Sequence, residues 1–219
     1  MKSAIVFSGG LDSTVALHQC IANGTAHIAI TMDYGQRHAY EVGVALQEAE
    51  LFGVRCVKVD LKGYGALLKG SALTDRSVPV PDGHYEDESM KSTIVPNRNM
   101  VFLAVATSIA IANGCDEVVY GAHKGDNAVY PDCRPEFIGA MQCAIALCDA
   151  HKIHLRAPFA NMTKADIVRE GYRLGVDMSA TFSCYHGTGI HCGTCGTCVE
   201  RREAFKLAGV IDKTIYQCM

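Results

Sequence analysis

The stretch Ala4-Ile5-Val6-Phe7-Ser8-Gly9-Gly10-Leu11-Asp12-Ser13-Thr14 decides the fold of this chain. It opens as a short apolar strand, turns at two adjacent glycines and continues into residues with helical spacing. Such a turn offers backbone N–H groups and the positive end of a helix dipole to an anion. We therefore predict a strand, a phosphate-binding loop and a helix; the alternative is a plain turn capped by Asp12 or Ser13.

Further strand-like segments follow along the chain. Runs rich in Val and Ile lie at residues 3–7, 26–31, 54–59, 116–120 and 153–156. The segments between them have helical spacing, and in residues 38–52 one face collects Val42, Ala45, Leu46, Ala49 and Phe52. Strands that alternate with helices form parallel sheets covered on both faces. The expected fold is a doubly wound, mostly parallel α/β sheet of the Rossmann-like kind.

Composition excludes several classes of protein. With 219 residues, 49% of them hydrophobic, the chain can bury an ordinary core. The longest apolar run, Met100 to Ala112, is too short to span a bilayer, so we expect a core helix there and no membrane partner. A net charge of −3 offers no basic field, so no direct nucleic-acid partner is expected. No signal peptide precedes Lys2, which predicts a reducing, cytoplasmic compartment.

The eleven cysteines fall into two groups. Seven are expected to be small buried side chains, namely Cys20, Cys56, Cys115, Cys133, Cys143, Cys148 and Cys218. The other four are Cys184, Cys192, Cys195 and Cys198, of which the last three have C-x2-C-x2-C spacing. Thiolates this close repel one another, and a Zn2+ ion with four tetrahedral ligands relieves that repulsion. Four ordinary cysteines and an iron–sulfur cluster are the alternatives.

The chain is expected to divide into two parts. Residues 1–180 would form the phosphate-binding domain, and residues 181–219 a helical appendage that holds a structural Zn2+. Gly193 and Gly196 each follow a cysteine, where a tight turn at positive φ is expected. Residues 60–98 lack a regular pattern and contain three prolines and an acidic run. Because a loop of that length is commonly functional, we predict a lid there.

The residues of the first loop resemble a known family. Ser-Gly-Gly-x-Asp-Ser directly after the first strand is similar to the pyrophosphate loop of the ATP pyrophosphatase family, which has an adenine nucleotide alpha hydrolase-like fold. The resemblance implies that ATP binds to Phe7, Ser8, Gly9, Gly10, Leu11, Asp12, Ser13 and Thr14. It also implies a phosphate-binding lysine, and Lys164 at the start of the last long helix fits that place. Mg2+ is expected near Asp12, which as a residue of this loop is expected to face solvent.

Four segments narrow the resemblance to the 7-cyano-7-deazaguanine synthase family. They are residues 7–14, Asp33-Tyr34-Gly35-Gln36-Arg37-His38, Tyr130-Pro131-Asp132-Cys133-Arg134, and Ser183-Cys184-Tyr185 with the cysteine run. This resemblance implies that the chain converts 7-carboxy-7-deazaguanine and ammonia to a nitrile with ATP, through adenylated intermediates. It also implies a homodimer.

The resemblance suggests roles for residues outside the loop. Asp12, Lys164 and Arg98 are the candidate catalytic residues. A deazaguanine presents two N–H donors that a carboxylate can accept side by side, which makes Asp132 the candidate for substrate recognition. Tyr130, Arg134 and Arg98 complete the candidate substrate site, with Arg98 or Arg134 pairing with the substrate carboxylate. A surface turn at Asp132 and a nucleophilic Cys133 stay open as alternatives.

Two departures from the commoner pattern affect these expectations. Asn97 stands where Gly is common, and Asn tolerates positive φ best among the other residues. Residues 121–127 lack the Cys-Glu-Thr-Asp-Phe-Ser of commoner members, so His123 or Asp126 is expected to serve as the base. Competing functions are a tRNA sulfurtransferase, an enzyme that delivers the activated acid to another acceptor, and a non-catalytic zinc module.

Overall fold

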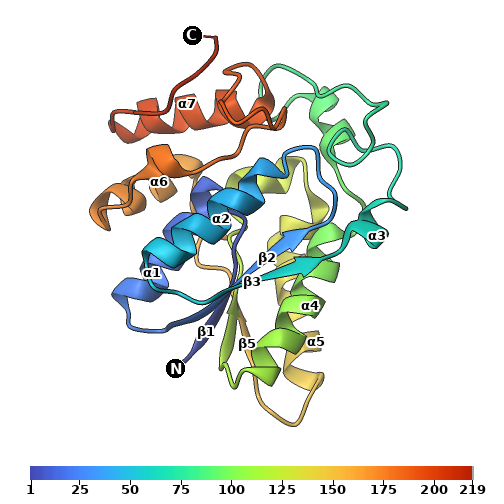
Figure 1. Cartoon of the computed structure of the whole chain (residues 1–219), viewed down its shortest axis with the longest axis vertical. Helices are drawn as coiled ribbons and strands as arrows, with labels where there is room; N and C mark the ends of the chain where they lie inside the picture. The colour runs from blue at the N-terminus through green and yellow to red at the C-terminus, as the bar shows by residue number, and fades with distance from the viewer. Residues whose placement is uncertain (219) are drawn as a thin grey trace.

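Five parallel strands form the centre of the computed structural model, which describes residues 1–218 (Figure 1). The strands are β1 (Ser3–Val6), β2 (Ala26–Asp33), β3 (Cys56–Asp60), β4 (Glu117–Val119) and β5 (His154–Arg156), in the spatial order β3-β2-β1-β4-β5. Each coincides with a predicted strand-like run. The order reverses beside β1, because β2 lies on one side of it and β4 on the other. The predicted doubly wound sheet is confirmed.

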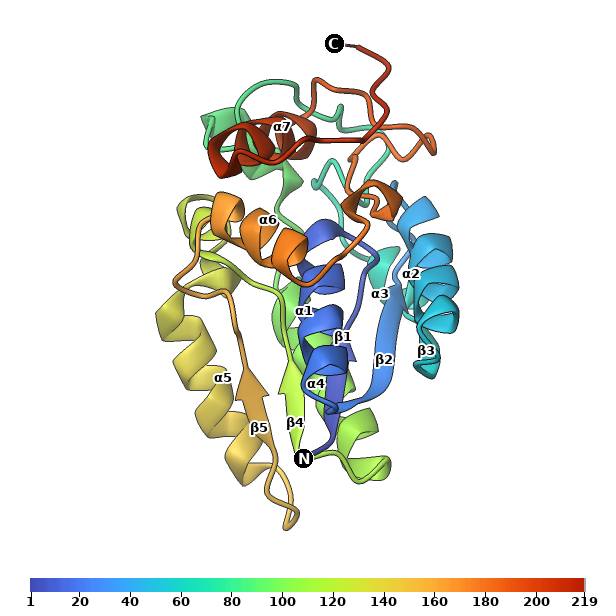
Figure 2. The ribbon, with the colours of Figure 1, turned by 90° about the vertical axis from the view of Figure 1, so that its left-hand side faces the viewer.

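Helices cover both faces of this sheet (Figure 2). The α-helices are α1 (Leu11–Ala22), α2 (Tyr40–Leu51), α3 (Lys62–Gly65), α4 (Arg98–Ala112), α5 (Pro135–Leu147), α6 (Lys164–Arg173) and α7 (Gly196–Ala208). The 3-10 helices are η1 (Glu88–Thr93), η2 (Lys124–Ala128), η3 (Pro131–Cys133) and η4 (Met178–Ala180). Side chains of α4 and α5 pack with Ala4 on one face, and those of α1, α2 and α6 with Ile5 on the other. Successive residues of a strand point to opposite faces, which separates the two cores.

Two details of the helices differ from expectation. Lys164 does begin α6, but α7 follows it and is longer, so α6 is not the last long helix. The predicted face of α2 is correct at Val42, Ala45 and Ala49, whereas Leu46 and Phe52 are 36% and 39% exposed. Helical spacing therefore locates the buried stripe of α2. The width of that stripe depends on how far the sheet extends beneath the helix.

The segment 60–98 is tied to the rest of the fold (Figure 1). The Arg37 guanidinium donates to the backbone carbonyl oxygens of Ala72, Asp75 and Val78 at 2.9–3.1 Å. Farther along, Gly83 N donates to Thr194 O at 3.1 Å, beside the cysteine run. Some buried side chains of the segment 60–98 join those of the cysteine run in one apolar cluster. The role of this segment as a lid stays a prediction.

The cysteines outside the cluster are less buried than expected. Cys20, Cys115 and Cys133 are buried, but Cys56 is half-buried and Cys143, Cys148 and Cys218 are exposed. The first three face the cores, while Cys143 and Cys148 lie on and just after the outer side of α5. Residue type alone does not decide which face of a helix a cysteine occupies. Among the described residues, no helix is long and apolar enough to cross a membrane.

Gly9 determines how closely the phosphate loop packs on α2. Gly9 has φ +79°, and a Cβ there would lie 2.8 Å from both Ala45 N and Glu41 O. Gly9→Ala is therefore expected to lower the free energy of unfolding by about 1–3 kcal/mol, from backbone strain and overlap with α2.

Gly53→Ala is the matched control, because Gly53 has φ +65° and a Cβ there meets nothing within 4 Å. Urea unfolding of both variants separates backbone strain from packing. An equal loss in the two variants contradicts a packing requirement at Gly9.

Candidate functional site

A cavity lies at the carboxyl ends of β1, β2 and β4, next to the reversal of strand order. Ligands of doubly wound sheets bind at such a switch point. The cavity is lined by the phosphate loop, by the loop after β4, by the first turns of α2 and α4, and by residues of the cysteine-rich part. Elements far apart in the sequence therefore converge on one site.

The phosphate loop is held open by its two serines. Ser8 N and Ser8 Oγ each contact Ser13 Oγ, at 3.2 and 3.1 Å, and Ser13 Oγ donates to Gly10 O at 3.1 Å. Gly10 occupies the N-cap position of α1, and no side chain caps it. The simple turn capped by Asp12 or Ser13 is therefore wrong. The loop presents the start of α1 to the cavity, the arrangement that suits an anion.

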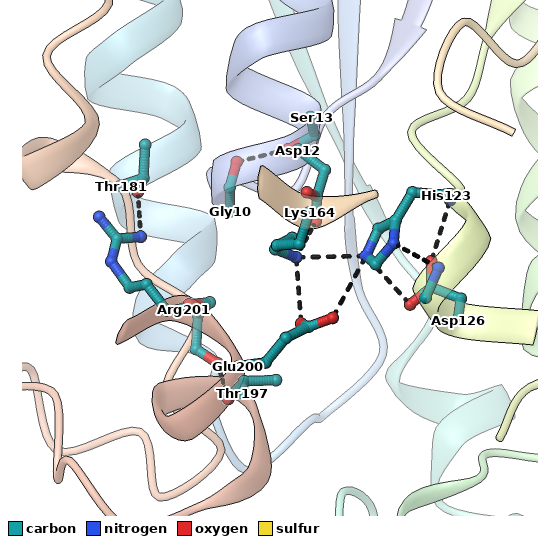
Figure 3. Close-up of polar contacts among 12 residues, drawn as sticks. Gly10, Asp12, Ser13, His123, Asp126, Lys164, Thr181, Thr197, Glu200 and Arg201 are labelled. Carbon is teal, nitrogen blue, oxygen red and sulfur yellow. Dashed lines mark hydrogen bonds and ion pairs between the residues drawn. The ribbon is translucent and has the colours of Figure 1, made fainter. Parts of the chain in front are cut away.

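An ion cluster stands beside this loop (Figure 3). Lys164 Nζ lies 2.7 Å from Asp12 Oδ2, 3.4 Å from Glu200 Oε2 and 3.3 Å from His123 Nε2. Thr163 and Asp166 form a capping box that begins α6 and directs Lys164 toward the loop. Asp12 was expected to face solvent, but it lies in the first turn of α1 with its side chain 24% exposed. The later helices α6 and α7 enclose it.

The charges of this cluster support one another. Burial opposes ionisation of Asp12, yet Lys164 and His123 outweigh it and lower the pKa of Asp12. Burial also opposes the charge on Lys164, but Asp12 and Glu200 raise its pKa. Burial raises the pKa of Glu200. Lys164 therefore carries a permanent positive charge in a partly desolvated site, where electrostatic interactions are strong.

Of the two expected bases in the loop after β4, Asp126 lines the cavity and His123 lies buried behind it, outside the lining. His123 is 1% exposed, and its Nε2 lies 3.4 Å from Asp126 Oδ1. Asp126 Oδ2 accepts from His123 N at 3.1 Å, and Asp126 Oδ1 accepts from Tyr85 Oη at 3.0 Å. Tyr85 belongs to the segment 60–98. The unusual sequence at residues 121–127 thus forms an ordered, hydrogen-bonded part of the site.

Two of the expected substrate residues line the cavity. Arg98 Nη1 donates to Tyr34 Oη at 3.5 Å, and its guanidinium lies 5.9 Å from the ring of Phe102. Tyr130 Oη contacts Thr93 Oγ1 at 2.7 Å and Tyr185 Oη at 2.9 Å. Arg98 begins α4 directly after Asn97, whose φ of 56° is left-handed as anticipated for the residue that replaces Gly.

Three neighbouring residues of the Tyr130–Arg134 segment lie differently. Asp132 Oδ2 accepts from Asn99 N at 3.1 Å, at the N-terminus of α4, and Asp132 is not among the residues that line the cavity. Exposed Arg134 donates to Asn127 O at 3.0 Å, also outside the lining. Cys133 does line it, but burial raises the pKa of this thiol. A neutral, buried thiol argues against a nucleophilic Cys133.

The four late cysteines come together as a metal-binding group. The Sγ atoms of Cys184, Cys192, Cys195 and Cys198 lie within 4.8 Å of one another, and all four residues are buried. Cys195 N donates to Cys192 Sγ at 3.3 Å, and Cys192 N donates to Cys184 Sγ at 3.4 Å. Hydrogen bonds from Cys195 and Cys198 lower the pKa of Cys184. Four buried sulfurs that share negative charge fit a soft divalent cation.

The two glycines of the cysteine run have different reasons to be there. Gly193 has φ +89° and turns tightly against Cys218 O, as predicted. Gly196 is instead the first residue of α7, so the predicted turn there is wrong. A Cβ on Gly196 would lie 2.6 Å from Met90 Sδ, so a side chain there would require the buried Met90 of η1 to shift.

Sequence reasoning did not name Glu200 as a site residue. It lies two residues after Cys198 in α7, and its side chain is 13% exposed beside Lys164. Its position close to the cysteine run was the one indication that Glu200 lies near the rest of the fold. Nothing in the spacing showed that Glu200 lies beside the phosphate loop.

Together, the parallel fold and the loop after β1 with its lysine form a site that suits a phosphate-bearing ligand. The chain matches the family described as "Queuosine biosynthesis protein QueC" over residues 2–209, and it belongs to that family. Its relatives include a protein named 7-cyano-7-deazaguanine synthase from Psychromonas ingrahamii, 44% identical over 99% of this chain and 98% of the relative. Another of that name, from Allorhizobium ampelinum, is 49% identical over 99% and 93%.

Solved structures support the fold alone. The NMN synthetase from Francisella tularensis superposes with a TM-score of 0.53 at 14% identity, covering 97% of this chain and 79% of that one. The likeness agrees with a doubly wound sheet and carries no information about substrate.

Proposed function

We propose that this protein converts 7-carboxy-7-deazaguanine and ammonia to 7-cyano-7-deazaguanine, using ATP through adenylated intermediates. The observation that carries the proposal is the phosphate loop with Asp12 and Lys164 in the same cavity as Arg98 and Tyr130. The close relatives named for this synthase support the substrate. The nucleotide and a flat acid can then meet at the switch point of the sheet.

The reaction requires a carboxylate to become an electrophile. An oxygen of the substrate carboxylate attacks the α-phosphorus of ATP, and pyrophosphate leaves. Ammonia then adds to the acyl carbon, loses a proton, and displaces AMP to give the amide. A second adenylation, on the amide oxygen, followed by loss of AMP and of the amide protons gives the nitrile. The loop N–H groups and Lys164 stabilise charge on the departing pyrophosphate.

The residues of the site fit a magnesium ion. Asp12 Oδ1 is buried and has no hydrogen-bond partner, although its companion Oδ2 pairs with Lys164. Carboxylate oxygens together with nucleotide phosphates are the usual ligands of Mg2+. Asp12 is thus the residue that would hold the ion, which supplies charge neutralisation for the pyrophosphate.

Proton transfer falls to the loop after β4. His123 Nδ1 accepts from Gly125 N at 3.0 Å, so a neutral ring carries its proton on Nε2. Asp126, which lines the cavity, is therefore the residue of this loop placed to take a proton released from ammonia or the amide. His123 Nε2, 3.4 Å from Asp126 Oδ1, and Tyr85 Oη hold that carboxylate in place. This arrangement stands in the place of the Cys-Glu-Thr-Asp-Phe-Ser stretch of commoner members, which this sequence lacks at residues 121–127.

Cellular setting and assembly follow the same reasoning. We infer a cytoplasmic homodimer that binds small molecules rather than nucleic acid or membranes. A tRNA sulfurtransferase would need paired cysteines at the site, and Cys133 stands alone among the described residues that line the cavity.

The nucleotide product tests the proposed function. ATP, Mg2+, ammonium and the acid are expected to give AMP, pyrophosphate and the nitrile, and ATP use should stop when the acid is omitted. Asp12→Asn is expected to abolish AMP formation, because the loop loses its charge partner for Lys164. Liquid chromatography with mass spectrometry measures all products. ADP with phosphate, or an ester or thioamide in place of the nitrile, contradicts the proposal.

Zinc content provides a separate prediction. We propose one structural Zn2+ per chain at Cys184, Cys192, Cys195 and Cys198, where four thiolates leave no open position. Cys195→Ser is expected to lose the metal and unfold more readily, since structural zinc contributes on the order of 10 kcal/mol of apparent binding free energy. The exposed-site control, Cys143→Ser, should retain it. Elemental analysis that finds no metal, or iron, in unchelated protein refutes the assignment.

Asp132 is predicted to recognise the guanine-like edge of the substrate. Each charged hydrogen bond contributes about 1.5–3 kcal/mol, so Asp132→Asn should lower kcat/KM for the acid by roughly 100-fold with little change in ATP affinity. Its contact with Asn99 N allows a second outcome. If the variant loses only thermal stability, Asp132 serves as a helix cap. Asp149→Asn, in the exposed turn after α5, is the control.

A further inference from the structure

Helix α7 joins the four-cysteine group to the ion cluster at the phosphate loop. It begins at Gly196, directly after Cys195, and carries both Cys198 and Glu200. Cys198 belongs to the metal-binding group, whereas Glu200 lines the cavity. One short helix therefore contributes to both places.

Glu200 contacts both Lys164, which is expected to act on the nucleotide, and the neighbouring His123. Its Oε2 lies 3.4 Å from Lys164 Nζ, and its Oε1 lies 3.9 Å from His123 Nε2 (Figure 3). Lys164 and His123 come from α6 and from the loop after β4. Glu200 is therefore the point at which α7 touches both.

Neighbouring residues of α7 hold this carboxylate in place. Thr197 Oγ1 donates to Ser183 O at 2.8 Å. Arg201, 1% exposed, donates to Met178 O at 2.6 Å and to Thr181 Oγ1 at 2.9 Å. These bonds lie on either side of Glu200 in the sequence, so this part of α7 cannot move away from the cavity without breaking them.

The position of Lys164 depends on more than Asp12. The ammonium must reach a phosphate while Asp12, 2.7 Å away, attracts it toward α1. Glu200 is the other carboxylate within 4 Å of this ammonium among the described residues, and it lies on α7. Without the Glu200 carboxylate, Asp12 would be the one described carboxylate within 4 Å of Lys164 Nζ, and His123 would lose its contact with α7.

We propose that Glu200 is a positioning residue that holds Lys164 and His123 for the nucleotide, so that the cysteine-rich part works as a component of the ATP site. The inference rests on the proposed ATP-dependent function. Its consequence is that loss of the metal impairs ATP use through displacement of α7, and not only through loss of stability.

Glu200→Gln tests this role, with Glu203→Gln as the matched control. Glu203 lies on the same helix with its side chain 53% exposed and pairs with His84 at 3.3 Å. Glu200→Gln is expected to lower kcat/KM for ATP at least tenfold, while metal content and the midpoint of thermal unfolding stay at wild-type values. Glu203→Gln should leave all three unchanged.

A double-mutant cycle distinguishes positioning from a general structural role. Lys164→Met and Glu200→Gln are expected to be non-additive in ATP affinity, measured by calorimetry, because the second change cannot displace an ammonium already removed. Additive effects, or near-normal kcat/KM in Glu200→Gln, overturn the proposal. Loss of metal or of fold in Glu200→Gln also overturns it, since Glu200 would then be a residue of stability.

The calorimetric arm separates this inference from the proposed function. If wild type binds ATP but fails to convert the acid, the proposed reaction is wrong, and the affinity cycle still decides the role of Glu200. If the reaction proceeds and the cycle is additive, only the inference about Glu200 fails.

Discussion

The ion pair between Lys164 and Asp12 is the interaction on which the site depends. It joins α6 to the first turn of α1, across 151 intervening residues of sequence, at a distance of 2.7 Å. The pair draws in His123 from the loop after β4 and Glu200 from α7. A single ammonium thus fixes the relative placement of four elements around the phosphate loop.

A buried cluster with three carboxylates is an unusual neighbour for a polyphosphate. Asp12, Asp126 and Glu200 oppose an anion, and Lys164 is the permanent cation among them. In the function we propose, a divalent cation bound with the nucleotide would relieve this conflict, and the buried Asp12 Oδ1, which has no hydrogen-bond partner, is the oxygen that would hold it.

The cysteine-rich part and the segment 60–98 act on the site by packing. Met90 of the segment 60–98 packs directly against Gly196 of the cysteine-rich part. Gly83 N of the same segment donates to Thr194 O beside the cysteines. These two parts of the chain also carry Tyr85 and Tyr185, which line the cavity. A structural metal can therefore support catalysis at a distance, because it fixes the backbone that carries these side chains.

The sequence by itself determined the strand order along the chain, the phosphate loop and the cysteine cluster. These features depend on the spacing of residues close together in the sequence, so they can be recognised without knowing how distant segments pack. It also anticipated the left-handed Asn97 and a helix that starts at Lys164. Local rules failed where burial was decided by a neighbouring element, as for Leu46 at the edge of α2 and Gly196 at the start of α7.

Only the tertiary structure decided which side chains meet in the cavity. Spacing suggested that Asp12 faces solvent, yet α6 and α7 pack over it. It offered no reason to select Glu200, because the contact with Lys164 exists only when α7 folds back over the loop. The Asp132 carboxylate likewise found a partner at the start of α4 that no motif specifies. Contacts between distant elements depend on how helices pack on a sheet, and one-dimensional patterns do not record that geometry.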